Sequence, residues 1–554
     1  MQQPPTLEEF YRSAGVQQVP AFAPFIRLSK APFQSQRRAL TLALAHDRWG
    51  IYDETGGGKT VPAQAAALYY IGFGNRALVL TLPILLQQFQ EDLCNDFIGS
   101  DRYVRTHILQ EAPDGRRKLF AQWEADNSWP ELLIMTYEMF ATATDWVESI
   151  GPDGQPLRKP GKSLPSKVGP MLPSPGAVIK ERSTPVWEVL QKANYNVVIT
   201  DETQKIRGTD GLMFKRVEAY VGRPEEGKTA FFPLTGTPMY TSPLDAYALI
   251  RLTSPDLYES WYHFERKHAK FQKIRLKNPI KGKNGREIRT IRKLVGYQRL
   301  EELNRNLYRR ASRTMKADIP ELTGLRSPII RPVPVELHPK HLELYRRLAE
   351  ERFLELGDGE IITALQEQEL RQKVLQIVTC PELFCAPGEA PPNHMVSACL
   401  ELMKEVIDDR KVIIFANFRK TVESLKGEFD EFCPAVIYGG MTPAARQTER
   451  DRFLRDDQCR ALLANMEAAG AGLNLQHVSH TIIVVEPTSV PGRFKQAMDR
   501  IVRFGQEYQS MVYILKALST VAPEAIKEML RRDTDIAEVN RDRKSLRHFY
   551  QIAA

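Results

Sequence analysis

Residues 53–60 read Asp-Glu-Thr-Gly-Gly-Gly-Lys-Thr, and this stretch decides the fold. It ends in the Gly-Lys-Thr of a phosphate-binding loop, whose backbone N–H groups wrap phosphates at the start of a helix. We expect Lys59 to neutralise the β and γ phosphates and the Thr60 hydroxyl to bind Mg²⁺. Asp53 holds the place of the usual first glycine, and a glycine-rich turn without a ligand is the alternative. The predicted nucleotide-binding glycines are Gly56, Gly57 and Gly58.

A buried strand that ends in two acids follows downstream. Residues 196–202 read Asn-Val-Val-Ile-Thr-Asp-Glu. A carboxylate at the carboxyl end of a strand, beside a phosphate loop, can hold Mg²⁺, and its neighbour can polarise the attacking water. We assign the metal to Asp201 and the catalytic water to Glu202. An acidic helix N-cap is the common alternative for such a pair. With the phosphate loop upstream, the pair predicts ATP hydrolysis.

Two arginines near the carboxyl terminus complete the predicted catalytic set. Residues 496–506 read Gln-Ala-Met-Asp-Arg-Ile-Val-Arg-Phe-Gly-Gln. Arg500 and Arg503 stand three positions apart, which predicts that both project from one face of a helix. Such a pair on a second lobe can reach a γ-phosphate held by the first and stabilise charge in the transition state. A solvated arginine pair is the alternative.

Short aliphatic runs alternate with helical patterns along the rest of the chain. Runs of this kind are typical of strands buried on both faces of a parallel sheet. The clearest are Ala77–Leu80, Leu132–Met135, Val197–Thr200, Val412–Phe415, Ala461–Ala464, Thr481–Val485 and Val512–Leu515. Because they fall into an early and a late group, they predict an α/β protein with two parallel-sheet lobes.

The length of 554 residues exceeds what one hydrophobic core supports, so we divide the chain into parts. We predict an N-terminal extension at 1–27 and a first lobe at 28–255 with a flexible insertion at about 150–185. A basic hairpin and helical insertion is expected at 256–330, a helical linker region at 331–392, and a second lobe with a tail at 393–554. The predicted helices of the middle region are Leu300–Arg313, His338–Leu356 and Ile361–Val378.

Positive charge is concentrated in one segment, although the net charge of the whole chain is only +8. Residues 266–293 hold twelve lysines and arginines against one acid, Glu287. Asn284-Gly285 within this segment is a strong signal for a two-residue β-hairpin turn. A basic hairpin fits a polyanionic partner, and a solvated charged surface is the alternative.

Metal and membrane patterns are weak. Three cysteines and a histidine lie near one another in sequence (Cys380, Cys385, His394 and Cys399). They lack the paired two-residue spacings of a zinc site, so buried free thiols are the better interpretation. No window approaches the ~18 apolar residues of a membrane helix. The start of the chain lacks the layout of a signal peptide, which predicts a cytoplasmic location.

Taken together, these motifs resemble the SWI/SNF-type ATPases, a branch of helicase superfamily two. Residues 53–60 are similar to that family's Asp-Glu-Met-Gly-Leu-Gly-Lys-Thr, and 496–506 to its motif VI, Gln-Ala-x-x-Arg-x-x-Arg-x-Gly-Gln. Further matching segments are Pro32–Gln34, Thr136–Glu138, Leu234–Pro238 (motif III), Arg309–Arg310, Arg313–Lys316, Ile319–Leu322 and Ala468–Leu475 (motif V). The segments occur in the family's order between about residues 28 and 520.

The resemblance implies two RecA-like lobes, the cofactors ATP and Mg²⁺, and further site residues. Gln34 would read adenine and Gly472 would line the nucleotide. The residues implied to couple hydrolysis to DNA grip are Thr203, Gln204, Thr235, Thr237 and Gln496. Thr203 and Gln204 stand where the family has Ala-His, which we expect to alter coupling. Residues 486–490 replace the family's Trp-Asn-Pro, so no role is assigned there.

The predicted function is an ATP-dependent translocase on double-stranded DNA that remodels branched DNA or protein–DNA complexes, similar to compact motor-only members in bacteria and their viruses. The candidate strand contacts are Pro83, Thr136, Tyr137, Asn417, Arg419 and Asn474. The candidate duplex-clamping residues are Lys281, Lys283, Arg286 and Arg289. We expect sequence-independent DNA binding by a monomer. The alternatives are a strand-separating helicase, a motor subunit of a restriction, nuclease or RNA-polymerase assembly, and an inactive DNA-binding scaffold.

Overall fold

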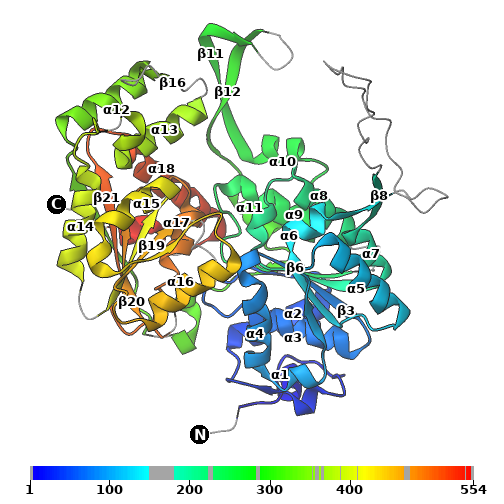
Figure 1. The fold of residues 1–554 in the computed structure, drawn as a ribbon. Helices are drawn as coiled ribbons and strands as arrows, with labels where there is room; N and C mark the ends of the chain where they lie inside the picture. Colours follow the sequence, from blue (N-terminus) through cyan, green and yellow to red (C-terminus); the bar gives the residue numbers. More distant parts are fainter. Residues whose placement is uncertain are drawn as a thin grey trace, which may run out of the picture. The chain divides into compact units, whose positions relative to one another are not determined.

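The chain divides into two compact units in the computed structural model (Figure 1). Unit 1 comprises Met1–Pro32, Gln36–Gly50 and Thr60–Leu234, and unit 2 comprises Phe33–Ser35, Ile51–Lys59 and Thr235–Ala554. The structure describes residues 4–148, 180–222, 229–281, 287–322, 324–351, 353–355, 361–363, 367–386, 388–407, 410–466, 474–503, 505–542 and 544–550. The predicted domain boundaries stay a prediction, because the units follow a different division of the chain.

Unit 1 is built on a five-stranded parallel sheet in the order β10-β9-β3-β6-β5. Its strands are β3 (Arg76–Thr81), β5 (Thr106–Ile108), β6 (Leu132–Thr136), β9 (Tyr195–Thr200) and β10 (Ala230–Pro233). Helix α3 (Thr60–Gly72) packs on β3 and β9, and α4 (Leu86–Asp96) packs on β5 and β6. Because the strands are parallel, their carboxyl ends lie at the same edge of the sheet, and Asp201 and Glu202 follow β9 at that edge.

Unit 2 contains a six-stranded parallel sheet in the order β14-β21-β20-β17-β19-β18. Its strands are β14 (Ile329–Val335), β17 (Lys411–Ala416), β18 (Ala435–Ile437), β19 (Ala461–Asn465), β20 (Ser479–Val484) and β21 (Met511–Ala517). With two parallel sheets of buried strands, the predicted α/β class with two lobes is confirmed.

Alternate residues of β17 enter two separate cores in unit 2. Val412 and Ile414 pack in a cluster with α14 (His394–Val406) and α15 (Arg419–Glu428). Ile413 and Phe415 pack in a second cluster with α16 (Pro443–Arg455), α17 (Pro491–Met498) and α18 (Ala522–Asn540). Because successive side chains of a strand point to opposite faces, a sheet covered on both faces requires the continuous aliphatic runs that the sequence shows.

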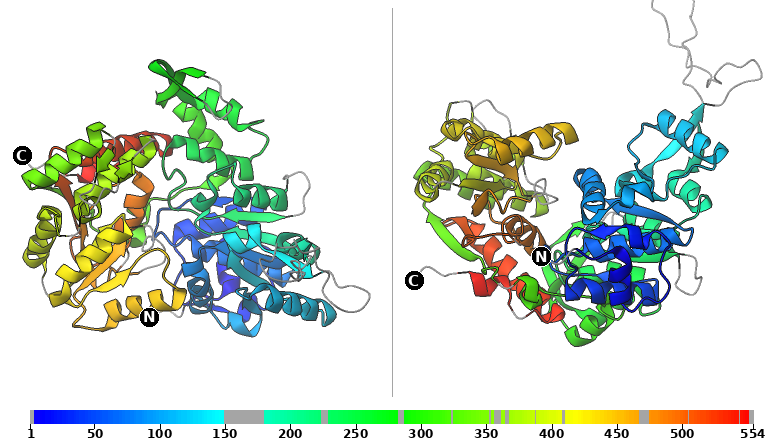
Figure 2. Two further views of the ribbon diagram at one scale, coloured as in Figure 1. Left: turned by 45° about the horizontal axis from the view of Figure 1, so that its top comes forward. Right: turned by 90° about the horizontal axis from the view of Figure 1, so that it is seen from below.

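The basic segment forms a long antiparallel hairpin of β11 (Ala269–Lys281) and β12 (Glu287–Tyr297), which confirms the predicted hairpin. Figures 1 and 2 show it as an arm that extends beyond α10 (Trp261–His268) and α11 (Leu300–Leu307) of the same unit. The expected Asn284-Gly285 turn lies outside the described residues.

The predicted helical linker region is partly wrong, because it contains strands. β14 is the edge strand of the unit 2 sheet and holds Pro332 and Pro334. Proline lacks an N–H for the ladder and so is confined to edge strands, which makes the pattern hard to recognise. Strands β15 (Phe353–Glu355) and β16 (Ile361–Thr363) pair where helix was predicted. The helices that form are α12 (Pro339–Glu351) and α13 (Glu367–Thr379).

Two smaller predictions also differ from the structure. The helix expected at Leu300–Arg313 ends at Leu307, because Ala311 and Ser312 form a strand, β13, that pairs with β2 (Gly50–Ile51). The insertion at about 150–185 is not loop throughout, since β8 (Lys180–Pro185) pairs with β7 (Thr144–Glu148) through backbone hydrogen bonds that need no apolar periodicity. Residues 149–179 lie outside the described part of the chain. Among the described helices, none has the length and apolar character to span a bilayer.

Candidate functional site

The glycines of the phosphate loop occupy positions that other residues fit poorly. Gly56 and Gly58 have φ angles of +87° and +78°, in the left-handed region that favours glycine. At Gly57, a Cβ atom would lie 3.0 Å from the Glu54 carbonyl oxygen, which accepts a hydrogen bond from the Gly57 N–H at 2.8 Å. The loop thus makes a tight, glycine-dependent turn that ends just before α3 begins at Thr60.

Asp53, which replaces the usual first glycine, is buried at the start of the loop. Its side chain is 1% exposed, and Lys59 is 8% exposed. Burial raises the pKa of the Asp53 carboxyl, while the nearby positive charges of Lys59 and Arg313 act in the opposite direction. The aspartate is therefore a packed part of the loop.

Motif III packs directly on the phosphate loop within unit 2. A Cβ atom at Gly236 would collide with the Thr55 hydroxyl and would lie 2.8 Å from the Thr55 backbone nitrogen. The Thr235 N–H donates to the Ile51 carbonyl at 3.2 Å, and the Thr235 hydroxyl accepts from the Thr237 N–H at 3.0 Å. Gly236, between the two threonines, therefore lies in direct contact with the phosphate loop, and the coupling role of Thr235 and Thr237 stays a prediction.

The acid pair follows β9 in unit 1. The Asp201 carboxylate accepts a hydrogen bond from the Thr81 hydroxyl at 3.2 Å, and the backbone N–H of Asp201 donates to the Leu80 carbonyl at 2.8 Å. Glu202 adopts a left-handed φ of +52°, is 9% exposed, and accepts from the Gln204 side-chain amide. The Thr203 hydroxyl donates to the Leu234 carbonyl at 3.0 Å, so the residue that replaces the family's alanine ties this turn to the start of motif III.

One predicted strand contact supports the acid pair instead. Tyr137 is fully buried, and its hydroxyl donates to the Asp201 carbonyl at 2.8 Å. Burial raises the pKa of Tyr137, so the hydroxyl stays a neutral donor. Thr136 caps helix α6 (Tyr137–Thr142) by accepting from the Met139 N–H. The prediction that the Tyr137 side chain faces DNA is therefore wrong, because packing of α6 turns the ring into the core.

The arginine pair is placed asymmetrically. Arg503 approaches the phosphate loop, since a Cβ atom at Gly56 would lie 3.7 Å from its Cγ atom. Arg500 is 1% exposed, and its Nε donates to the Gln496 carbonyl at 2.9 Å. The predicted shared helical face is wrong, because α17 ends at Met498. The Arg500 carbonyl accepts from the Leu475 N–H, which takes the chain out of the helical path.

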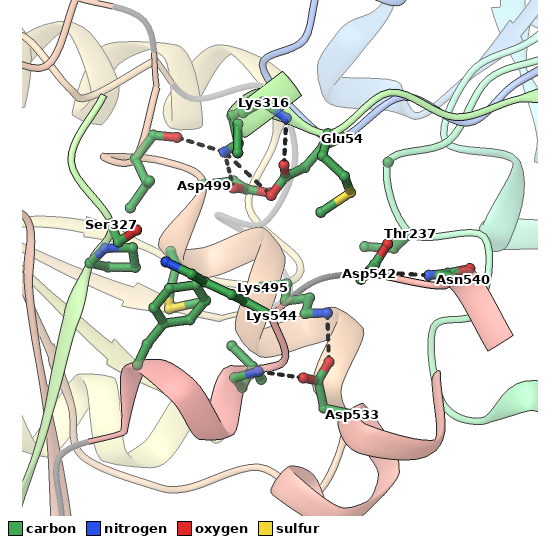
Figure 3. Close-up of a pocket in the computed structure, with 18 of the residues that line it drawn as sticks. Glu54, Thr237, Lys316, Ser327, Lys495, Asp499, Asp533, Asn540, Asp542 and Lys544 are labelled. Atoms are coloured by element: carbon green, nitrogen blue, oxygen red, sulfur yellow. Dashed lines mark hydrogen bonds and ion pairs between the residues drawn. The ribbon is translucent and has the colours of Figure 1, made fainter. Parts of the chain in front are cut away.

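A segment to which the sequence assigned no role joins the loop to motif VI. The Lys316 ammonium group donates to Asp499 and to the Val502 carbonyl, both at 2.8 Å, and the Lys316 N–H donates to Glu54 at 2.8 Å. Figure 3 shows Lys316 reaching both carboxylates. Within unit 2, this lysine fixes the distance between the phosphate loop and the turn that carries Arg503.

Arg313 makes the second set of bonds in the same segment. It donates to both carboxylate oxygens of Asp542 at 3.1 Å, and to the carbonyl oxygens of Tyr52 at 3.0 Å and Gly236 at 3.5 Å. A cavity of about 390 Å³ lies beside these bonds, lined by Glu54, Thr237, Lys316, Asp499 and Asp542 among others (Figure 3). Asp499 lies within a recognised motif, whereas no local signal marks Asp542.

The remaining predicted residues are distributed over both units. Gln34, Pro83, Arg289, Arg419 and Asn474 are exposed. The Gln34 N–H donates to Glu321 at 3.3 Å in unit 2. The Asn417 side-chain amide donates to the Glu486 and Pro487 carbonyl oxygens at 3.1 and 3.3 Å, so its donor is turned inward. Gly472, Lys283 and Arg286 lie outside the described residues, as does the side chain of Lys281.

No cluster of three or more histidine, cysteine or acidic side chains suited to a metal occurs in the described part of the chain. The six cysteines are free, and burial raises the pKa of the thiols of Cys380, to about 12, and Cys399. For Mg²⁺, the predicted ligands Thr60 and Asp201 in unit 1 offer oxygen donors, the type that this ion prefers.

A phosphate-binding loop, an acid pair after a parallel strand and an arginine beside the loop define the class of helicase-like ATPases. A family model described as the SNF2-related domain matches residues 51–386, and one described as the helicase conserved C-terminal domain matches residues 395–505. The chain therefore belongs to the SNF2-related family.

Relatives of this family occur widely. The chain is 24% identical over 504 residues to Protein CHROMATIN REMODELING 4 of Arabidopsis thaliana, covering 85% of this chain and 19% of that protein. It is 24% identical over 353 residues to the uncharacterised ATP-dependent helicase YqhH of Bacillus subtilis, covering 62% and 60%. The Sulfolobus solfataricus SWI2/SNF2 ATPase core in complex with dsDNA aligns over 95% of this chain and 98% of that one, with 17% identity and a TM-score of 0.34.

Proposed function

We propose that this chain is an ATP-dependent double-stranded DNA translocase that remodels branched DNA or protein–DNA complexes. The observation that carries the proposal is the position of Arg503 against the phosphate loop. Lys316 supports it by bonding both Glu54 of the loop and Asp499, which lies four residues before Arg503. A cation at this point can stabilise charge on a transferring phosphoryl group. Family membership and the basic hairpin support DNA as the partner.

In the proposed reaction, ATP and Mg²⁺ are bound by residues of the loop and the acid pair. Lys59 neutralises the β and γ phosphates, and Thr60 and Asp201 hold Mg²⁺, which neutralises charge on the phosphates when bound. Glu202 orients and polarises the attacking water, and Gln204 orients the Glu202 carboxylate. Arg503 acts on the γ-phosphate. We infer that the buried Arg500 positions the turn after α17 that carries Arg503, since its guanidinium bonds the carbonyl oxygen of Gln496 in that helix.

The hairpin supplies the proposed hold on duplex DNA. The described residues of β11 and β12 expose six cations, namely Lys270, Lys273, Arg275, Arg289, Arg292 and Lys293. Arg292 stacks on the Phe271 ring at 3.9 Å and pairs with Glu265 at 3.4 Å, which stiffens the base of the arm. Phosphate contacts carry no base information, so binding of this kind is sequence-independent and weakens with salt.

The test is ATPase activity of the full chain with single-stranded, duplex, forked and four-way DNA, together with triplex displacement. A translocase on duplex DNA hydrolyses ATP in response to duplex and displaces the third strand without separating the duplex. Unwinding of a forked duplex would instead support the helicase alternative. No stimulation by any DNA would overturn the proposal. We further propose that the protein is a monomer and is associated with DNA in the cytoplasm.

A further inference from the structure

The carboxyl end of β20 in unit 2 carries a buried acid for which the sequence indicated no role. Glu486 is 1% exposed and lies two residues beyond β20. Its Oε1 accepts hydrogen bonds from the hydroxyls of Thr379 and Thr421, the latter at 2.5 Å. Its Oε2 accepts from the N–H groups of Asn417 and Phe418 at 2.5 and 3.1 Å. One carboxylate therefore joins α13, α15 and the loop after β17.

The two backbone contacts lie at the start of α15. Phe418 is the N-cap residue of this helix, and its side chain makes no capping hydrogen bond. An unfilled helix start leaves N–H groups without partners and carries partial positive charge, both of which favour an anion. Glu486 supplies that anion from 68 residues away in sequence. The shape of the first turn of α15 thus depends on a residue outside the helix.

The first residue of α15 is an exposed cation. Arg419 follows Phe418 directly, pairs with Glu423 at 2.6 Å, and has its guanidinium 4.6 Å from the centre of the Tyr438 ring. The neighbouring Asn417 is fixed by Glu486 through both its N–H and its side-chain amide. Loss of the two backbone hydrogen bonds to Glu486 therefore removes the support of the backbone that precedes Arg419. Among the described residues, the hydrogen bonds of Glu486 involve neither the phosphate loop, the acid pair nor Arg503.

We propose that Glu486 is a positioning residue for DNA grip: its buried carboxylate fixes the first turn of α15 and thereby holds Arg419 in the pose that contacts the DNA backbone. This inference rests on the proposed function, because it gives one residue's part in the hold on DNA. The strand end carries a carboxylate whose partners are all within unit 2.

The four partners suggest an informative set of substitutions. In Glu486→Gln, the amide oxygen can still accept from the two backbone N–H groups, and the threonine hydroxyls can rotate to accept from the amide nitrogen. Glu486→Ala removes all four bonds. Thr421→Val removes one hydroxyl from the same carboxylate but leaves the two backbone bonds, so it is the matched control for a purely structural effect.

The experiment measures, in the full chain, the duplex DNA concentration that gives half-maximal ATPase stimulation. We expect a rise of about tenfold in Glu486→Ala, equivalent to about 1.4 kcal/mol, with the maximal rate retained. Glu486→Gln and Thr421→Val should stay near wild type. Arg419→Ala should show the same rise as Glu486→Ala, and the double variant should be no worse than either, because both act on one contact. Additive effects, or an unchanged half-maximal concentration in Glu486→Ala, would overturn the inference.

Amide hydrogen exchange separates this inference from the proposed function. The Asn417 and Phe418 amides should exchange faster in Glu486→Ala than in wild type or in Thr421→Val, with or without DNA. Equal exchange in all three overturns the inference even if DNA stimulates the enzyme. If wild type shows no DNA stimulation, the proposed function and with it the grip both fail. Should Glu486→Ala not fold, Glu486→Asp serves instead, because its shorter side chain cannot span the threonines and the loop together.

Discussion

Two strands, one in each unit, are followed by acids that accept hydrogen bonds from different kinds of donor. β9 lies between β10 and β3 in unit 1, and β20 lies between β21 and β17 in unit 2. After β9, Asp201 and Glu202 accept from the side chains of Thr81 and Gln204. After β20, Glu486 accepts from two backbone N–H groups as well as two hydroxyls. A side-chain donor such as that of Thr81 or Gln204 can change its rotamer when a ligand binds. The backbone donors at Asn417 and Phe418 cannot, so they fix the position of the Glu486 carboxylate.

The sharpest test of this comparison makes the same change at both strand ends. Glu202→Gln should lower the rate of ATP hydrolysis by about 100-fold or more while ATP binding is kept, because the amide cannot polarise the attacking water. Glu486→Gln should leave the maximal rate within about twofold, since the amide oxygen replaces the acceptor that matters. Steady-state ATPase rates and nucleotide binding measure both effects. Equal losses in the two variants would show that the two acids do not differ in their contribution to ATP hydrolysis.

Another buried carboxylate, that of Asp542, forms an ion pair, whereas the donors to Glu486 in the described part of the chain are neutral. Arg313 and Asp542 side chains are 10% and 2% exposed. Asp542→Ala should lower the free energy of unfolding by about 3–5 kcal/mol, because it leaves Arg313 buried without its carboxylate. The chain also offers a matched control, the exposed pair Arg309–Asp256, for which Asp256→Ala should cost about 0.2–1 kcal/mol.

Urea unfolding of both variants measures this difference. The double variant Arg313→Met with Asp542→Leu should recover part of the loss, because no uncompensated charge is then buried. If Asp542→Ala and Asp256→Ala cost the same, burial does not distinguish the two ion pairs.

The hairpin offers the corresponding test for exposed cations. Replacing Lys273, Arg275, Arg289 and Lys293 with alanine should weaken duplex binding by about tenfold. The slope of log affinity against log salt should fall by about 0.9 for each phosphate that the variant no longer neutralises. Exchange of the same positions for the other basic residue, arginine or lysine, keeps the charge and is the control. Unchanged affinity and slope would leave a solvated charged surface as the only role of the arm.

The smallest expected effect is a pH dependence at Glu486. Burial raises the pKa of this carboxyl against the lowering effect of its hydrogen bonds. The native state therefore binds the proton more readily than the unfolded chain. The stability that this group contributes is fully present below its unfolded pKa of about 4.3, and is lost as the pH rises through the raised native pKa.

Glu486→Gln has no such proton, so its stability relative to wild type should increase with pH over this window by about 1.4 kcal/mol for each unit of the pKa rise. Urea unfolding of both proteins at a series of pH values from 4 upward measures the difference. A difference that does not change with pH would show that the native and unfolded pKa values of Glu486 are equal.

The sequence by itself determined the elements whose signals are local. Gly56, Gly57 and Gly58 are required by backbone geometry at those positions, and continuous aliphatic runs such as Val412–Phe415 are required by sheets covered on both faces. The pairing of the two strands of the basic segment was likewise predicted from local sequence and is confirmed. In each case the residues that set the structure are neighbours, so their pattern can be read without knowing what lies next to them in space.

Only the tertiary structure decided which distant residues meet. Lys316 and Asp499 are 183 residues apart, and Arg313 and Asp542 are 229 apart, so no periodicity links them. The same limit hid the edge strand β14, whose prolines are tolerated only because one side of it is unpaired in the sheet. Arg500 turned inward and Tyr137 became a core residue for the same physical reason. The burial of a side chain is set by the elements that pack around it, not by its own neighbours in sequence.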